Sequence, residues 1–206
     1  MDVRDAGGPV PSPRQPPWPD ISRRRPAAAL RRAAIDLVFA LRRGYYRLKY
    51  PRLRLGRGVQ IRGRIRLRRG VRVTIGDGTR LNKLVRFAGP GEVRIGSDCL
   101  LNGTWIGCWT SVTIGDRCLL SDCELVDNDF HNLDPARRHE PPDPVTTRRP
   151  IVLEENVWVG AHALVLKGVR IGRDSVIGAA TVVRADVPPR VVVIGNPQQI
   201  VKKFDE

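Results

Sequence analysis

Aromatic side chains are scarce in this sequence, and long apolar runs are absent. Aromatic residues make up 5% and apolar residues 41% of the 206 residues, which include 20 glycines and 17 prolines. This composition argues against a helix bundle and favours one turn-rich, mostly β domain. The longest near-apolar run, residues 33–41, is interrupted by Asp36. It is far shorter than the roughly 20 residues that a membrane-spanning helix needs.

The sequence also lacks a CxxC pair. Its cysteines lie at positions 99, 108, 118 and 123, and no histidine follows them at zinc-finger spacing. We interpret them as buried thiols of a protein in a reducing compartment. No secretory signal is recognisable either, so a cytoplasmic location is predicted.

Acidic residues are few in the first third of the chain. Residues 1–74 contain 20 Lys and Arg but four Asp and Glu, and this segment accounts for the formal net charge of +15. The segment has neither interleaved aromatic residues nor a helix-turn-helix pattern, so nucleic acid is not an expected partner.

Two segments precede the informative part of the chain. Residues 1–26 contain seven prolines and no apolar periodicity, which predicts a disordered tail. In residues 27–58, apolar positions recur at helical spacing between arginines as far as about residue 50, which predicts a basic amphipathic helix and a linker. Such a helix either caps the end of the domain or makes peripheral contact with an anionic membrane.

A repeat of six residues decides the expected fold. Within residues 153–188 an aliphatic residue occupies every first position, and the residue four places later is small or β-branched. This period matches neither a helix nor simple strand alternation. It predicts a triangular coil whose parallel strands stack about 4.8 Å apart. We therefore expect an all-β parallel β-helix over residues 59–188. The aliphatic positions are Leu153, Val159, Val165, Ile171, Ile177 and Val183.

Residues 153–204, with LEENVWVGAHALVLKGVRIGRDSVIGAATVVRADVPP followed by IGNPQQIVKKF, resemble the hexapeptide-repeat acyltransferases. The likeness is strongest to the galactoside, maltose and nodulation O-acetyltransferases, and it extends loosely back to about residue 59. It implies a left-handed β-helix, a homotrimer, and acetyl-CoA bound between subunits without a metal. Within the C-terminal extension, residues 189–206, the sequence Gly195-Asn196-Pro197 is expected to lead into a short helix.

A polar, proline-rich loop, residues 127–150, interrupts the repeat. In the resembling enzymes an insertion here carries the catalytic histidine, which implies that His131 in DNDFH is the general base. No covalent acyl-enzyme is expected. Asp129, or else Asp127, would orient the imidazole, and Asp127 and Asn102 are assigned to the acceptor site. The alternatives are a surface-loop histidine, turn-forming aspartates and a corner-forming asparagine.

The same resemblance assigns residues to the cofactor. The sequence VWVGAH and the coil after it would flank the pantetheine arm, and two basic residues would hold the coenzyme A phosphates. The residues so assigned are Trp158, Gly160, Ala161, Ala179, Arg184 and Lys202. The chain departs from the family where Arg184-Ala185 replaces a Thr-Lys pair and Gln199 replaces an arginine.

The predicted function is transfer of an acetyl group from acetyl-CoA to a hydroxyl of a sugar or glycan intermediate, as in polysaccharide biosynthesis. One alternative is a non-catalytic trimeric scaffold with a basic membrane-binding N-terminus. Another is a zinc hydratase that would use His131, His139 and His162. The gaps between these histidines, 8 and 23 residues, argue against the zinc enzyme.

Overall fold

The computed structural model describes residues 26–205. The tail predicted for residues 1–26 lies outside this range except for Pro26. Two units are distinguished along the chain, residues 1–35 and residues 36–206, and each is considered by itself. In the described residues, no helix has both the length and the apolar character needed to cross a membrane.

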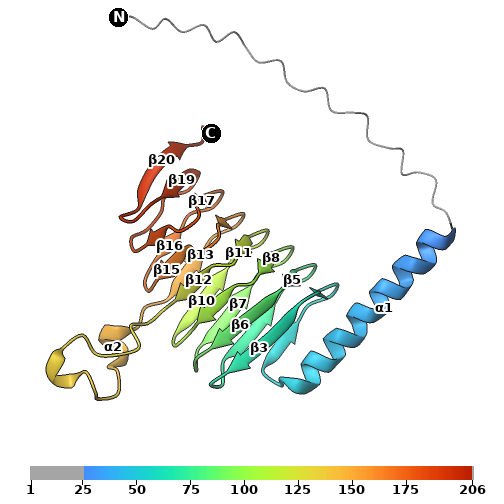
Figure 1. Ribbon diagram of the computed structural model, residues 1–206, viewed down its shortest axis with the longest axis horizontal. Coiled ribbons are helices and arrows are strands. Elements are labelled where there is room, and N and C mark those ends of the chain that lie inside the picture. The colour runs from blue at the N-terminus through green and yellow to red at the C-terminus, as the bar shows by residue number, and fades with distance from the viewer. Residues whose placement is uncertain (1–25, 206) are drawn as a thin grey trace, which may run out of the picture. The chain divides into compact units, whose positions relative to one another are not determined.

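Three sheets form the β-helix (Figure 1), and their strands are parallel except for the last one, β20 (Gln199–Lys203). The first contains β1 (Leu53–Leu55), β4 (Arg72–Ile75), β7 (Glu92–Ile95), β10 (Ser111–Ile114), β13 (Ile151–Leu153) and β16 (Arg170–Ile171). The second contains β2 (Gln60–Ile61), β5 (Arg80–Asn82), β8 (Leu100–Asn102), β11 (Leu119–Ser121), β14 (Trp158–Val159), β17 (Val176–Ile177), β19 (Val191–Ile194) and β20 (Gln199–Lys203). The third contains β3 (Arg64–Arg68), β6 (Leu84–Ala88), β9 (Trp105–Gly107), β12 (Glu124–Val126), β15 (Leu164–Leu166) and β18 (Val182–Val183). From β1 to β18 consecutive strands belong to different sheets, so each of these coils contributes one strand to every sheet.

The sixfold pattern is confirmed by the burial of its side chains. All six aliphatic first positions between 153 and 183 are at most 1% exposed, and the small positions, such as Ala163 and Thr181, are fully buried. Corners demand close approach of successive coils. A Cβ on Gly76 would lie 2.5 Å from the carbonyl carbon of Gly96, so only glycine fits there.

All four cysteines are free and buried, as predicted. Two of them occupy the small inward position of a hexad. The thiols of Cys99 and Cys118 donate to the carbonyl oxygens of Gly115 and Glu154, each at 3.1 Å. Their place is in the core of the β-helix.

Helix α1 spans Pro26–Lys49 and matches the predicted amphipathic helix. Its C-terminal part contacts the first coil through polar groups. The guanidinium groups of Arg42, Arg43 and Arg47 donate to the carbonyl oxygens of Gly63, Val59 and Leu55. These bonds satisfy carbonyl groups at the edge where the stack of coils begins, which would otherwise expose unpaired strands. This part of the helix therefore caps the domain.

The apolar positions of α1 do not make that contact. Leu37, Val38, Leu41, Tyr45 and Leu48 are between 52% and 86% exposed. The amphipathic pattern predicted the helix correctly, but the apolar stripe faces solvent and not the β-helix.

The predicted loop leaves the third sheet after β12 and returns to the first sheet at β13. It contains the 3₁₀ helix η1 (Pro135–Arg137) and the short helix α2 (Pro144–Thr147), each begun by an aspartate whose side chain accepts a backbone N–H. An antiparallel bridge between Asn128 and Arg148 closes the base of the loop.

The predicted C-terminal helix is wrong. The chain turns after Ile194 and returns as β20, which pairs antiparallel with β19. The β-branched residues Ile200 and Val201 favour an extended chain, and β19 otherwise offers an unpaired edge to which the segment can bond. The strands also extend beyond the expected limits of 59 and 188, since the first begins at Leu53 and β19 ends at Ile194.

Candidate active site

The base of the loop is fixed by Asp127. This residue is fully buried, and its two carboxylate oxygens accept the backbone N–H groups of Trp109 and Thr110, each at 2.7 Å. Its carbonyl oxygen accepts the N–H of Arg149 at 3.0 Å. Asp127 thus ties both ends of the loop to the preceding coil. Contact of its carboxylate with an acceptor stays a prediction.

Asp129 holds the loop to the following coil. Its carboxylate pairs with the ammonium group of Lys167, which also donates to the carbonyl oxygen of Thr146 at 3.0 Å. The carbonyl oxygen of Asp129 accepts the N–H of His131 at 2.8 Å. Asp129 therefore positions the histidine through its main chain. Orientation of the imidazole by its carboxylate stays a prediction.

His131 lies exposed between two anchored neighbours. Phe130 adopts a φ of +63°, which is unusual for an aromatic residue, and its ring packs edge-on against Trp109 with centroids 5.0 Å apart. Asn132 is 6% exposed, and its side-chain amide donates to the carbonyl oxygen of Arg137 at 2.8 Å. The two anchors fix the chain on either side of His131 and leave its side chain accessible from solvent.

Asn102 is not brought to His131 within one chain. It ends β8, where it stands in register with Asn82 and Ser121 of the second sheet. His131 follows β12 of the third sheet. The strands of the third sheet run from the corner after Asn102 to the corner before His131. The two residues therefore lie at opposite ends of those strands.

Four of the predicted cofactor residues do lie together, in β14 and at the corners that follow β14 and β17 of the second sheet. Trp158 is 51% exposed on its outer face, and the N–H of Gly160 donates to the carbonyl oxygen of Ile177 at 2.8 Å. A Cβ on Gly160 would lie 2.9 Å from the backbone nitrogen of Ala179, so the coils are tightly stacked here. Ala161 lies at the same corner, where its carbonyl oxygen accepts the N–H of Ala180 at 2.8 Å.

The two basic cofactor residues lie on different sheets. Lys202 of β20 is in one row with Trp158, because Trp158 pairs with Val176, Val176 with Val192, and Val192 with Lys202. Arg184 follows β18 of the third sheet, at the same end of the strands at which the loop follows β12. Its backbone N–H donates to the side-chain oxygen of Gln198 at 2.7 Å.

Beside the loop lies a hollow of about 410 Å³ that was not predicted from the sequence. Its basic lining comes from β3 and β6 and the turn after β3, and its aromatic lining includes Phe130, next to His131. The lining residues that bear on the chemistry are Arg66, Arg68, Arg69, Arg86, Trp105, Trp109 and Phe130. The alternating arginines of RIRLR and the two tryptophans of WIGCW were the available signal.

The three histidines do not form a metal site within one chain. Among the described residues there is no group of three or more His, Cys, Asp or Glu side chains placed to hold a metal ion. His131 and His139 belong to the loop, and His162 to the corner between β14 and β15. This arrangement does not favour the zinc hydratase.

Residues 150–185 match the family described as "Bacterial transferase hexapeptide (six repeats)". These residues therefore carry a hexapeptide repeat like that of bacterial transferases. A galactoside O-acetyltransferase from Lactococcus lactis is 34% identical over 97 residues, which are 47% of this chain and 45% of that enzyme. The chain thus spans about half the length of this curated relative.

Solved structures share the fold over most of the chain. A hexapeptide-repeat acetyltransferase from Vibrio cholerae is 26% identical, with a TM-score of 0.52 over 87% of this chain and 90% of that one. An N-acyltransferase from Bacillus cereus, solved with dTDP-4-amino-4,6-dideoxyglucose and coenzyme A, gives a TM-score of 0.62 at 19% identity, over 74% of this chain and 84% of that one. The second likeness concerns the fold alone.

Proposed function

We propose that the protein is an acetyl-CoA-dependent acetyltransferase that acylates a hydroxyl group of a sugar. One observation carries the proposal: the loop that interrupts the hexapeptide repeat holds His131 exposed, between anchored neighbours, beside a hollow lined with aromatic and basic side chains. The relatives reported above are named as acyl- or acetyltransferases, which supports the same class of reaction.

In the proposed reaction, the imidazole of His131 takes the proton from the acceptor hydroxyl as its oxygen attacks the thioester carbonyl. The carbon–sulfur bond then breaks, and the imidazolium returns the proton to the departing thiolate of coenzyme A. An imidazole suits both steps because its usual pKa is about 6.5. No acyl-enzyme forms, so the chain must hold both substrates at once.

The thioester would lie along the second sheet, near Trp158 and the tightly stacked corner of Gly160, Ala161 and Ala179. A pantetheine arm is narrow and amphipathic, which suits a half-exposed tryptophan beside small residues. Lys202 in the same row, and Arg184 on the third sheet, would supply positive charge for the phosphates. The name of the Lactococcus lactis relative, a galactoside O-acetyltransferase, supports an acetyl donor.

The active form is proposed to be a homotrimer, as the family resemblance implies. Asn102 and His131 lie at opposite ends of the strands of the third sheet, so a second copy would be needed to bring the two corners together. The outer face of the second sheet carries an apolar row of Leu100, Leu119, Trp158, Val176 and Val192, linked by strand register. Exposed apolar rows of this kind mark interaction surfaces.

Peripheral membrane contact through residues 27–58 is proposed for the exposed stripe of α1. Leucine and valine side chains at positions 37, 38, 41 and 48 face solvent on a helix rich in arginine, as in helices that lie in anionic bilayer surfaces. Sedimentation with anionic vesicles tests this, with Leu41→Glu expected to release the protein. Equal binding of that variant would contradict membrane contact. The cytoplasmic location also stays a prediction.

The transferase reaction is tested by release of free coenzyme A thiol from acetyl-CoA, with a panel of neutral sugars and amino sugars as acceptors. The protein should turn over at least one hydroxyl acceptor, and His131→Ala should lower kcat by about 10²–10⁴-fold, the usual contribution of a general base. An amino sugar as the better acceptor would change the acceptor group to an amine. Turnover of every acceptor that is unchanged in His131→Ala would contradict the mechanism, and no turnover at all would favour the trimeric scaffold.

A further inference from the structure

Two adjoining hollows run along the outer face of the third sheet. The first, of about 550 Å³, lies between the C-terminal part of α1 and β3, and its lining includes Arg42, Tyr45 and Lys49. The second is the hollow of about 410 Å³ beside the loop of His131. Arg66 and Arg68 line both, so the two hollows share one wall.

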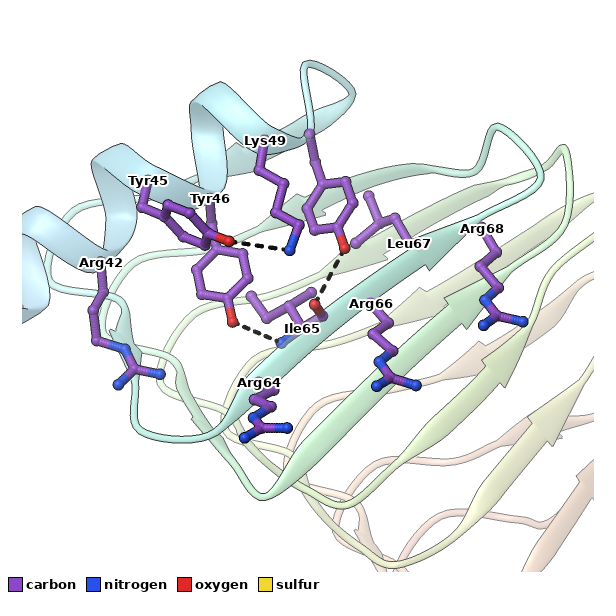
Figure 2. A pocket seen from close by; sticks show the side chains of 10 residues that line it. Arg42, Tyr45, Tyr46, Lys49, Arg64, Ile65, Arg66, Leu67 and Arg68 are labelled. Carbon is purple, nitrogen blue, oxygen red and sulfur yellow. Dashed lines mark hydrogen bonds between the residues drawn. The ribbon is translucent and has the colours of Figure 1, made fainter.

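Arginines form this shared wall and continue on either side of it. Arg64, Arg66 and Arg68 point outward from alternate positions of β3, and Figure 2 shows them in a row along that strand. Arg66 stands in register with Arg86 of β6. Like charges directly opposite one another on adjacent strands destabilise a sheet. Among the described residues, none of these four guanidinium groups forms an ion pair.

Some arginines elsewhere on the β-helix have carboxylate partners. Arg94 pairs with Glu92 at 2.8 Å and Arg170 with Glu154 at 2.5 Å on the first sheet. Arg72 at the N-terminal end of the first sheet stands in register with Glu92, whereas Arg66 of the third sheet stands in register with Arg86, so like charges lie side by side on β3 and β6. An anion bound across Arg66 and Arg86 would relieve that repulsion.

The two hollows differ in the side chains that line their outer ends. Toward α1 the wall is formed by Tyr45, Tyr46 and Tyr50, with the ammonium group of Lys49 donating to the hydroxyl of Tyr45 at 3.1 Å (Figure 2). Toward the loop it is formed by Trp105 and Phe130, whose rings are nearly parallel with centroids 6.3 Å apart. Parallel strands lie about 4.8 Å apart, so β9 is roughly 10 Å from β3.

We infer that the acceptor is a sugar carried on a phosphate or diphosphate. This inference rests on the proposed transferase function and names its substrate class. The diphosphate binds to Arg66, Arg68 and Arg86, because guanidinium groups bind phosphate oxygens in pairs of parallel hydrogen bonds. The sugar ring packs on Trp105 and Phe130 next to His131, and the carrier group extends along the tyrosines toward α1. The distance between β3 and β9 suits the separation of a diphosphate from the far side of its sugar.

The site is tested by calorimetric titration of the full chain with inorganic pyrophosphate in the absence of acetyl-CoA. The wild-type protein should bind pyrophosphate, more weakly at high salt. The double variant Arg66→Gln/Arg86→Gln should lose about tenfold or more in affinity, as expected when charge-assisted hydrogen bonds are removed. The matched control, Arg54→Gln/Arg72→Gln, changes two outward-facing arginines of the first sheet and should bind like the wild type.

Pyrophosphate binding that is absent, or equal in both double variants and the wild type, would overturn the inference. Unchanged thermal unfolding of the Arg66→Gln/Arg86→Gln variant would show that the loss of binding is local. Binding is measured without turnover, so the two proposals fail separately. A chain that binds pyrophosphate through these arginines but releases no coenzyme A contradicts the transferase alone.

Turnover then distinguishes the two sources of a diphosphate sugar. A nucleotide-linked sugar is compared with the same sugar on a polyprenyl diphosphate in phosphatidylcholine vesicles, each with wild type and the Arg66→Gln/Arg86→Gln variant. Higher kcat/KM for either carrier that falls in the variant supports the site and identifies the carrier. A neutral glycoside used as well as both diphosphate sugars would contradict it.

Discussion

At the scale of single residues, the loop holds a strained backbone conformation next to His131, the proposed general base. Phe130 is held at a positive φ by the bond from its N–H to the side-chain oxygen of Asn128, at 2.8 Å, and by its packing against Trp109. Backbone strain of this kind typically persists only where the surroundings impose it. Here it turns the chain so that His131 is exposed while Asn132 is buried.

Sequence alone could name His131 but could not place its neighbours. DNDFH made His131 the candidate base through resemblance, whereas the partners of Asp127 and Asp129 depend on contacts with residues 17–38 positions away. The aspartates therefore looked like possible partners of the imidazole, although their carboxylates bond to the loop base and to Lys167. The sixfold repeat of the sequence does not predict hydrogen bonds between residues so far apart.

The buried thiols make stability depend on pH. Burial raises the pKa of Cys108 and that of Cys123 to about 12. In the unfolded chain these thiols ionise at about pH 8.5, so between that pH and 12 the folded state binds more protons than the unfolded state. Their contribution is complete below about pH 8.5 and is lost as the pH rises through this window.

We predict that the free energy of unfolding falls by up to about 1.4 kcal/mol per pH unit for each of these two thiols above pH 9. Urea unfolding at several pH values, at fixed protein concentration, measures the slope. Cys123→Ala, although destabilised, should have a shallower slope than the wild type. Equal slopes would contradict a raised thiol pKa.

At the scale of elements, α1 shows why amphipathic periodicity predicted a helix but not its buried face. The pattern of leucines and arginines gave the helix almost to the residue, since it spans Pro26–Lys49. The natural expectation is that the leucines face the domain. The edge of a β-helix, however, presents unpaired carbonyl groups, which arginine side chains can satisfy and leucines cannot.

Tyr46 is a buried contact of this element with the first coil. Its side chain is 6% exposed, and its hydroxyl accepts the backbone N–H of Ile65 at 3.2 Å. We predict that Tyr46→Phe lowers the free energy of unfolding by about 1–3 kcal/mol, because it leaves a buried N–H without an acceptor. Denaturant unfolding measures the change.

Tyr45→Phe is the matched control for this variant. Tyr45 is 55% exposed, and its hydroxyl interacts with Lys49 at the surface. Its loss should change stability by less than about 0.5 kcal/mol. Equal effects of the two substitutions would show that Tyr46 does not anchor the helix.

At the scale of the whole molecule, the β-helix was predictable because one short period fixes it. The hexads after residue 153 are regular and specified the coil, whereas the coils before residue 75 have arginine-rich corners and were predicted to start later than they do. The last segment was predicted wrongly because Gly195-Asn196-Pro197 was expected to lead into a short helix, and the sixfold repeat does not specify the pairing of residues 199–203 with β19.

The apolar row of the second sheet makes assembly testable. Trp158→Glu introduces a charge at the half-exposed centre of that row, so a trimer that buries it should dissociate. Size-exclusion chromatography with light scattering should give about 23 kDa in place of a threefold larger mass. Thr74→Glu, on the outer face of the first sheet, is the control and should stay trimeric. A wild-type chain that is itself monomeric would contradict the assembly.

The most direct measurement of the central claim is chemical rescue of acetyl transfer at His131. The rate of coenzyme A release is compared among wild type, His131→Ala and His139→Ala, with and without added imidazole. His139, an exposed histidine of the same loop, should be replaceable without loss. The account predicts that His131→Ala alone loses activity and that imidazole restores part of it, since a free base can then take the hydroxyl proton. Full activity of His131→Ala without imidazole would contradict it.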